Sequence, residues 1–149
     1  MNATELLKQD HREVENLMMM LEDETTASND IFERLKSTIT LHTQVEEEIF
    51  YPAMEEFDET LEMVERSYDE HSEVEQILED MTGLNPQDEE FQDLLVELRD
   101  SVNLHAQEEE TEVFPKAEEL LGEEELSAIG NEIEQMKNNS GLNRSVSVN

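Results

Sequence analysis

Residues 41–52 read LHTQVEEEIFYP, and residues 104–115 read LHAQEEETEVFP. Each copy carries a histidine near its start, a glutamate four residues later and a proline at its end. The same spacing holds for all four histidines of the chain, which form the pairs His11/Glu15, His42/Glu46, His71/Glu75 and His105/Glu109. Residues four apart lie on one face of a helix. Each pair therefore predicts an imidazole and a carboxylate on the same side of a helix.

Apolar residues surround these pairs at alternating spacings of three and four. In the segment 29–55 this stripe consists of Phe32, Leu35, Ile39, His42, Glu46, Ile49 and Ala53. Similar stripes run through 4–25, 58–82 and 87–120, and such spacing is typical of the inward seam of packed helices. The seam of each helix is therefore interrupted by a histidine and a glutamate.

This pattern predicts an all-α protein. We expect four long helices at about 4–25, 29–55, 58–82 and 87–120, because glycine and proline are scarce and strict alternation is absent. Short connections favour an up-down-up-down antiparallel four-helix bundle. A shorter fifth helix is expected at about 123–137, after Gly122. We expect one bundle domain over residues 1–137 and a flexible polar tail over 138–149.

The composition limits the partners of this chain. Forty-one acidic residues face nine basic ones, which leaves a formal net charge of -32, and there is no cysteine. Disulfides and thiolate metal sites are thus excluded. Because DNA and acidic membranes would repel this surface, we expect neither nucleic acid nor membrane as a partner. The charge favours a halophilic, salt-adapted source, with an ordinary acidic cytosolic protein as the alternative.

The sequence also predicts where the protein resides. The first residues, MNATELLKQDH, are polar and do not resemble a signal peptide. No stretch reaches the apolar length of a membrane span. We expect a cytoplasmic protein.

The four His/Glu pairs are expected to meet inside the bundle. Successive histidines are 31, 29 and 34 residues apart, and near-equal intervals in antiparallel helices bring them to a similar depth. An apolar interior does not hold several unpaired carboxylates, because desolvating each ion costs several kcal/mol or more. The seams offer no lysine or arginine there, so two metal cations would supply the missing charge.

Imidazole and carboxylate donors without sulfur suit iron, manganese or zinc. The candidate metal ligands are His11, Glu15, His42, Glu46, His71, Glu75, His105 and Glu109. The alternative is a metal-free acidic bundle in which the buried glutamates are protonated or hydrated. Tyr51 and Tyr68 are expected in or near the core. Glu47 and Glu110 are expected on a solvated face; the alternative is that they swing inward as metal ligands.

The order His, His-x-x-x-Glu, His, His-x-x-x-Glu, with Tyr51 and Pro52 after the second histidine, resembles the hemerythrin-like family, also called the HHE cation-binding domain. The resemblance covers roughly residues 5–120. It implies a four-helix bundle with a non-haem diiron centre. The ligands that it implies are His11 and His42 for one iron, His71 and His105 for the other, and Glu46 and Glu109 as carboxylates that bridge both.

Two features depart from the oxygen-carrying members of that family. Those members have a fifth histidine where this chain has Glu75, and they place the last carboxylate where this chain has Glu110. The segments QDHREVENL from Gln9 and DEHSEVEQI from Asp69 repeat each other, so residues 1–57 and 58–120 resemble a duplication. We therefore expect a nearly two-fold symmetric centre.

Glu15 and Glu75 would serve that centre as terminal ligands or as acceptors of imidazole N–H bonds. Added carboxylate charge favours the ferric state, which argues against reversible oxygen carriage. The expected function is thus a diiron protein that binds or reacts with O2, peroxide or NO, or handles iron. The alternative is an iron-sensing or iron-storing module without turnover. A monomer and a homodimer both stay open, because the short fifth helix either closes the bundle end or mediates a dimer.

Overall fold

The structure is a computed structural model that describes residues 1–140. Within these residues every regular element is helical and no β-strand occurs, which confirms the all-α prediction. The expected tail at 138–149 begins inside the last helix, and its residues 141–149 lie outside the described part of the chain. No helix of residues 1–140 combines the length and apolar character that crossing a bilayer requires.

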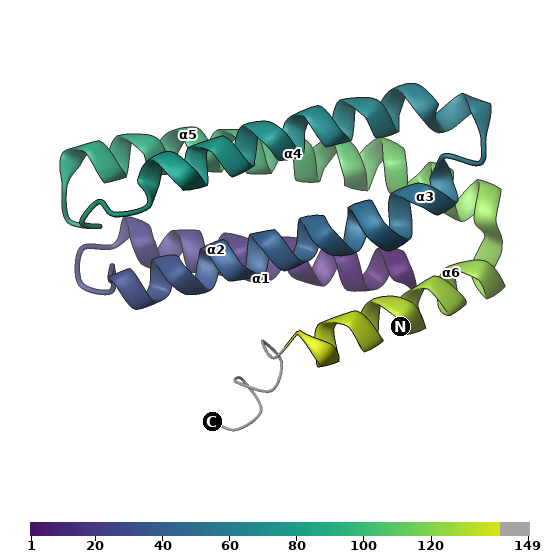
Figure 1. Cartoon of the computed structure of the whole chain (residues 1–149), viewed down its shortest axis with the longest axis horizontal. Coiled ribbons are helices and arrows are strands. Elements are labelled where there is room, and N and C mark those ends of the chain that lie inside the picture. The colour runs from purple at the N-terminus through teal and green to yellow at the C-terminus, as the bar shows by residue number, and fades with distance from the viewer. Residues whose placement is uncertain (141–149) are drawn as a thin grey trace.

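Four helical runs build the molecule, and two of them contain a π-helical turn (η1 and η3). The elements in chain order are α1 (Ala3–Glu22), α2 (Asn29–Val45), η1 (Glu46–Phe50), α3 (Tyr51–Met54), the 3-10 turn η2 (Asp58–Thr60), α4 (Leu61–Met81), α5 (Glu89–Glu108), η3 (Glu109–Val113) and α6 (Phe114–Asn139). Figure 1 shows that successive runs reverse direction, with α1 and α2 forming one pair and α4 and α5 the other. The bundle is thus antiparallel.

Local chemistry explains where the first two runs begin. The side chain of Asn2 accepts a hydrogen bond from the backbone N–H of Glu5, and the Glu5 carboxylate accepts one from the backbone N–H of Asn2. This reciprocal cap satisfies two donors at the helix end. Ser28 caps α2 by accepting from the backbone N–H of Ile31. Both runs therefore start where a polar cap precedes the apolar seam.

The last run corrects the expected short fifth helix. The elements α5, η3 and α6 adjoin one another and form one run of 51 residues, so a separate short helix at 123–137 is wrong. The run bends sharply at Gly122, where φ is 81° and ψ is 164°. A residue without a side chain beyond Cα adopts this conformation readily. Beyond the bend, α6 turns back and packs along α1 (Figure 1).

The core consists of two apolar clusters with a polar layer between them. The first cluster lies toward α3 and α6 and includes Leu7, Phe50 and Phe114; the second lies toward the opposite turns and includes Phe32 and Phe91. Along each helix the histidine falls between residues of the two clusters. The polar layer therefore sits in the middle of the bundle, enclosed by apolar packing on both sides.

Candidate metal centre

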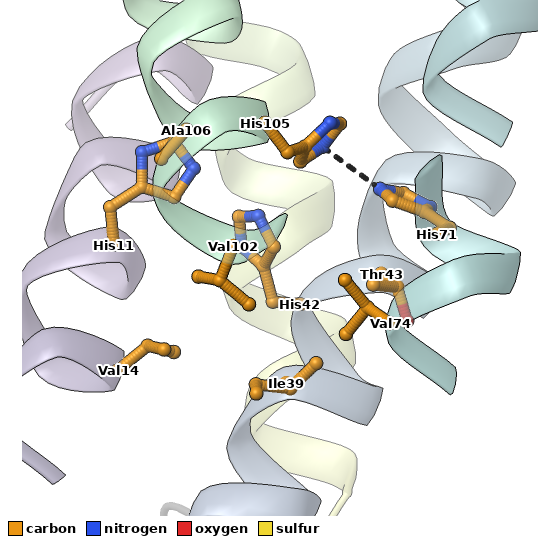
Figure 2. Close-up of a pocket in the computed structure, with 10 residues that line it drawn as sticks. All are labelled: His11, Val14, Ile39, His42, Thr43, His71, Val74, Val102, His105 and Ala106. Atoms are coloured by element: carbon orange, nitrogen blue, oxygen red, sulfur yellow. Dashed lines mark hydrogen bonds between the residues drawn. The ribbon is translucent and has the colours of Figure 1, made fainter. Parts of the chain in front are cut away.

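Six of the eight candidate ligands meet in this polar layer. They form two groups, and the donor atoms within each group lie within 4.8 Å of one another. The first group consists of His11, His42 and Glu109, and the second of Glu46, His71 and His105. Five of the six side chains are buried and His11 is half-buried. Figure 2 shows imidazoles from different helices turned toward a common interior. The two groups are consistent with a binuclear metal site.

Glu109 connects the two groups. Its Oε1 atom lies 3.0 Å from His11 Nε2, and its Oε2 atom lies 3.4 Å from His105 Nε2. One carboxylate therefore places an oxygen beside each group, which is the arrangement of a bridging ligand.

Glu46 makes the corresponding connection from the other half of the chain. Its Oε1 atom lies 3.0 Å from His71 Nε2 and 3.3 Å from His42 Nε2. Within the second group, His71 Nε2 and His105 Nε2 are 3.2 Å apart, as the dashed line in Figure 2 marks. Two bare imidazole nitrogens at this distance favour an ion or a proton between them.

Each imidazole uses its other nitrogen to contact a carboxylate behind it. The Nδ1 distances are 2.7 Å from His11 to Glu110, 2.8 Å from His42 to Asp10, 2.7 Å from His71 to Glu47 and 2.6 Å from His105 to Glu70. A carboxylate at Nδ1 orients the ring and leaves Nε2 for the interior, an arrangement common among metal-binding histidines. The sequence pointed to Glu47 and Glu110 only as alternative ligands, and it did not reveal the part played by Asp10 and Glu70.

These four contacts follow the internal repeat. Asp10 and Glu70 each precede a histidine, His11 and His71, by one residue. Glu47 and Glu110 each follow a glutamate of the centre by one residue. Equivalent contacts in the two halves give the site a nearly two-fold arrangement.

Glu15 and Glu75 lie elsewhere than expected. Both side chains are exposed, and neither belongs to either group, so the expectation that they point inward is wrong. The neighbouring residues Val14 and Val74 are buried instead. Burying a valine is favourable by roughly 1.5 kcal/mol or more, whereas burying a carboxylate is costly. Helices α1 and α4 are therefore rotated with valine facing inward.

Tyr51 is a site residue whose contact with the centre the sequence did not reveal. It is fully buried, and its hydroxyl lies 2.7 Å from Glu109 Oε2, 3.1 Å from Glu46 Oε1 and 3.3 Å from His71 Nε2. Five residues along an α-helix turn a side chain away by about 140°. The π-helical turn at η1 removes this offset, so Tyr51 faces the same way as Glu46.

In the metal-free site, the buried carboxylates raise the pKa values of two histidines. Burial alone would lower the pKa of His42, but the carboxylate of Glu46 and the hydrogen bond with Asp10 raise it well above the usual value. Burial likewise opposes the charged form of His105, yet Glu109 raises the pKa of His105 to about 11. Without metal, imidazolium ions would balance the buried carboxylates.

Protonation of the histidines leaves two buried polar atoms of the site without hydrogen-bond partners within residues 1–140. Among the described residues, neither His42 Nε2 nor Glu46 Oε2 has a hydrogen-bond partner, although both atoms are buried. The contact of His42 Nε2 with Glu46 Oε1 at 3.3 Å is an ion-pair distance without hydrogen-bond geometry. Buried polar atoms are rarely left without a partner. Nitrogen and oxygen donors left open toward the interior fit bound metal cations.

A small apolar cavity adjoins the histidines. It has a volume of about 30 Å³, and its lining includes the branched aliphatic residues Val14, Ile39, Val74 and Val102. Figure 2 shows these side chains beside and below His42. A cavity of this size admits one water-sized molecule. The aliphatic residues of the cavity belong to the second apolar cluster or pack against it, whereas Tyr51 belongs to the first cluster. The site therefore has room for a small ligand on the side away from Tyr51.

Comparison with known proteins relates the chain to others of its kind. A curated protein named DNA nickase, from Nostoc sp. (strain PCC 7120 / SAG 25.82 / UTEX 2576), is 28% identical over 142 residues, which cover 92% of this chain and 39% of that protein. The chain thus spans well under half the length of that relative. No solved structure matches the chain. Residues 2–117 match the hemerythrin HHE cation binding domain, and the chain belongs to this family.

Proposed function

We propose that this protein holds two non-haem iron ions and uses them to bind or react with a small oxidant, namely O2, peroxide or NO. The observation that carries the proposal is the sharing of Glu46 and Glu109 between two His-containing groups. Carboxylate-bridged metal pairs inside helical bundles are a known arrangement. His11 and His42 would hold one ion, and His71 and His105 the other.

Several features support iron and an oxidant. The donors are nitrogen and oxygen only, which suits iron and is also compatible with manganese or zinc. Iron would supply electron exchange with the oxidant. The aliphatic side chains of the cavity exclude bulk water and accept a small, weakly polar molecule. The carboxylates at Nδ1 hold the imidazoles in place while a ligand enters or leaves.

Metal analysis and spectroscopy test this proposal together. Protein loaded anaerobically with ferrous iron is expected to bind two ions per chain, and exposure to air or peroxide should consume oxidant and produce a ferric charge-transfer band. His42→Ala should reduce the bound iron, whereas Thr40→Ala, an exposed change on the same helix, should not. Two bound irons without any band or oxidant consumption would disprove the redox part. Manganese or zinc as the native metal would disprove the choice of iron.

An iron-sensing role is the second candidate, and one contact favours it. Lys137 of α6 forms an ion pair with Asp10, which itself contacts His42 Nδ1. Lys137 and Asp10 are both largely shielded from solvent. The end of α6 is therefore tied to the first group through two contacts. A change in the position of His42 on metal binding would therefore be transmitted to α6, which a partner protein could recognise.

Hydrogen exchange distinguishes the two candidates. A sensor predicts that chelation speeds amide exchange in α6 more than in α5, and that oxidant is not turned over. An oxidant-reactive centre predicts consumption of peroxide or O2 by the iron-loaded protein. A result in which α6 is equally protected with and without iron would rule out sensing through Lys137.

We do not extend the nicking activity named for the Nostoc relative to this chain. The chain covers 39% of that protein, and its net charge of -32 opposes approach to a phosphate backbone. A supercoiled plasmid incubated with the iron-loaded protein should stay intact under reducing and oxidising conditions. Metal-dependent conversion to the open circle would overturn this expectation.

A further inference from the structure

The two halves of the centre supply the same imidazoles and carboxylates at equivalent positions, but one pair of buried aromatic residues differs in chemistry. The spacing that relates Glu46 to Glu109 also relates Tyr51 to Phe114. Both rings are fully buried, and each follows a π-helical turn that starts at the glutamate. Tyr51 therefore brings an oxygen to the centre where the other half brings only carbon.

The Tyr51 oxygen lies beside two donor atoms of the second group and beside Glu109 Oε2, the oxygen that Glu109 turns toward His105 of that group. It is 3.1 Å from Glu46 Oε1, 3.3 Å from His71 Nε2 and 2.7 Å from Glu109 Oε2. Donors bound about 2.1 Å from one metal at right angles are roughly 3 Å apart. The spacing of the Tyr51 oxygen from its neighbours is thus that of a ligand in the same coordination sphere.

Phe114 leaves the first group without an equivalent donor. Its ring stacks on His11, with ring centroids 5.8 Å apart and planes 12° from parallel. Within the described residues, Glu46 Oε2 has no hydrogen-bond partner, whereas Glu109 Oε2 has the Tyr51 hydroxyl. The difference between the two halves is therefore chemical, and it lies at the centre itself.

We propose that Tyr51 is a phenolate ligand of the metal held by the second group, which makes the two metal positions unequal. The inference rests on the proposed binding of two metal ions. Tyrosine oxygen is an established ligand of ferric iron in proteins. The metal replaces the phenolic proton, which leaves with the other protons that metal binding releases. The metal at the first group then has one protein donor fewer and is the position open to a small ligand.

The absorption spectrum of the ferric protein tests this inference. A phenolate bound to ferric iron gives a visible charge-transfer band with resonance-enhanced ring vibrations, and the chain has two tyrosines in all. Tyr51→Phe should abolish the band while two irons per chain remain bound. Tyr68→Phe is the matched control, because the Tyr68 hydroxyl contacts Glu55 outside the centre; the band should persist at full intensity.

The two-fold repeat supplies a second variant. The double change Tyr51→Phe with Phe114→Tyr should restore a phenolate band, now from the first group. If Tyr51→Phe fails to fold, ring-deuterated tyrosine in the Tyr68→Phe protein, where Tyr51 is the sole tyrosine, should shift the enhanced vibrations.

The outcomes separate this inference from the proposed function. Wild-type protein that binds two ferric ions without a phenolate band would overturn the inference and leave the hydroxyl as a hydrogen-bond donor to Glu109. A band that survives in Tyr51→Phe would overturn it as well. Protein that binds no iron would overturn the proposed function first.

Discussion

At the scale of single residues, the carboxylates behind the imidazoles control the centre. Asp10 is buried and contacts His42 Nδ1 at 2.8 Å. Burial opposes its ionisation, but the hydrogen bond with His42 and the charge of Lys137 lower the pKa of Asp10. An ionised Asp10 holds the His42 ring with Nε2 toward the interior. Metal affinity should therefore depend on a residue that does not contact the metal.

Replacing Asp10 with asparagine tests this dependence. Removal of such a contact behind a ligand costs about 10–100-fold in metal affinity, so Asp10→Asn should weaken binding at the first group by this factor. Competition with a chelator of known affinity measures the change. Glu15→Gln removes the same charge at an exposed position outside both groups and should leave affinity unchanged. Equal loss in both variants would point to net charge as the cause.

The imidazoles also make the stability of the metal-free chain depend on pH. Burial works against a charged His105, but Glu109 raises its pKa to about 11, above an ordinary value near 6.5. Its stabilising contribution is complete below about 6.5 and is lost as pH rises through about 11. The pKa of His42 is shifted in the same direction, with Glu46 outweighing burial.

The urea midpoint of chelator-treated protein should consequently fall between about pH 7 and pH 10. In His105→Gln the fall should be shallower, because one of the raised imidazoles is missing. This comparison controls for the growing negative charge of the whole chain at high pH. A midpoint that is constant or rises over this interval would contradict the assignment of imidazolium ions to the metal-free site.

At the scale of elements, the π-helical turns and α6 position the centre. Each π turn begins at a glutamate of the centre and ends shortly before a proline, Pro52 or Pro115. Proline lacks an N–H and collides with the carbonyl four residues earlier in a regular helix. A wider turn relieves this conflict. Such turns are frequent at functional sites.

Helix α6 depends on a close approach at Gly130. A Cβ atom there would lie 2.4 Å from the carbonyl oxygen of Met1 and 3.1 Å from the backbone nitrogen of Ala3. These atoms belong to the backbone and do not move aside easily. Gly130 thus allows α6 to lie against the start of α1, which keeps Lys137 within reach of Asp10.

Gly130→Ala should lower the free energy of unfolding by about 1–3 kcal/mol, the usual cost of overpacking. Alanine favours helix by about 1 kcal/mol over glycine, and the clash should outweigh this gain. Urea denaturation measures the change, and Ser127→Ala on the exposed side of α6 serves as the control. An increase in stability would show that α6 does not pack closely on α1.

At the scale of the whole molecule, charge and bound metal act together. A formal net charge of -32 destabilises a compact chain through self-repulsion. Salt screens exposed charges over about 10 Å at 0.1 M and about 3 Å at 1 M. Buried groups of the centre are screened much less, so salt and metal should stabilise the protein by separate routes.

The thermal midpoint should therefore rise with sodium chloride between about 0.1 M and 1 M, both with and without iron. Iron should add a further increase at each salt concentration, because a ligand that binds only the folded state stabilises it. Calorimetry at matched pH measures both effects. A midpoint that falls with salt would contradict the expected dominance of self-repulsion and weaken the case for a salt-adapted source.

The sequence by itself determined the all-α class, the apolar seam and six of the eight candidate ligands, because these depend on local spacing. His42 and Glu46 share a helix face wherever that helix packs, and the same holds for His105 and Glu109. Apolar periodicity likewise predicted the buried residues Phe32, Leu35 and Ile39 of α2. The family followed from the order of these motifs.

The tertiary structure alone decided the rest, since it depends on how each helix is rotated against its neighbours. One residue along a helix changes the direction of a side chain by about 100°, so Val74 rather than Glu75 could be assigned inward only once packing was known. The π turn directed Tyr51 toward Glu109, and the bend at Gly122 brought Lys137 back to Asp10. Contacts between residues distant in the chain require that geometry, which spacing within one helix does not contain.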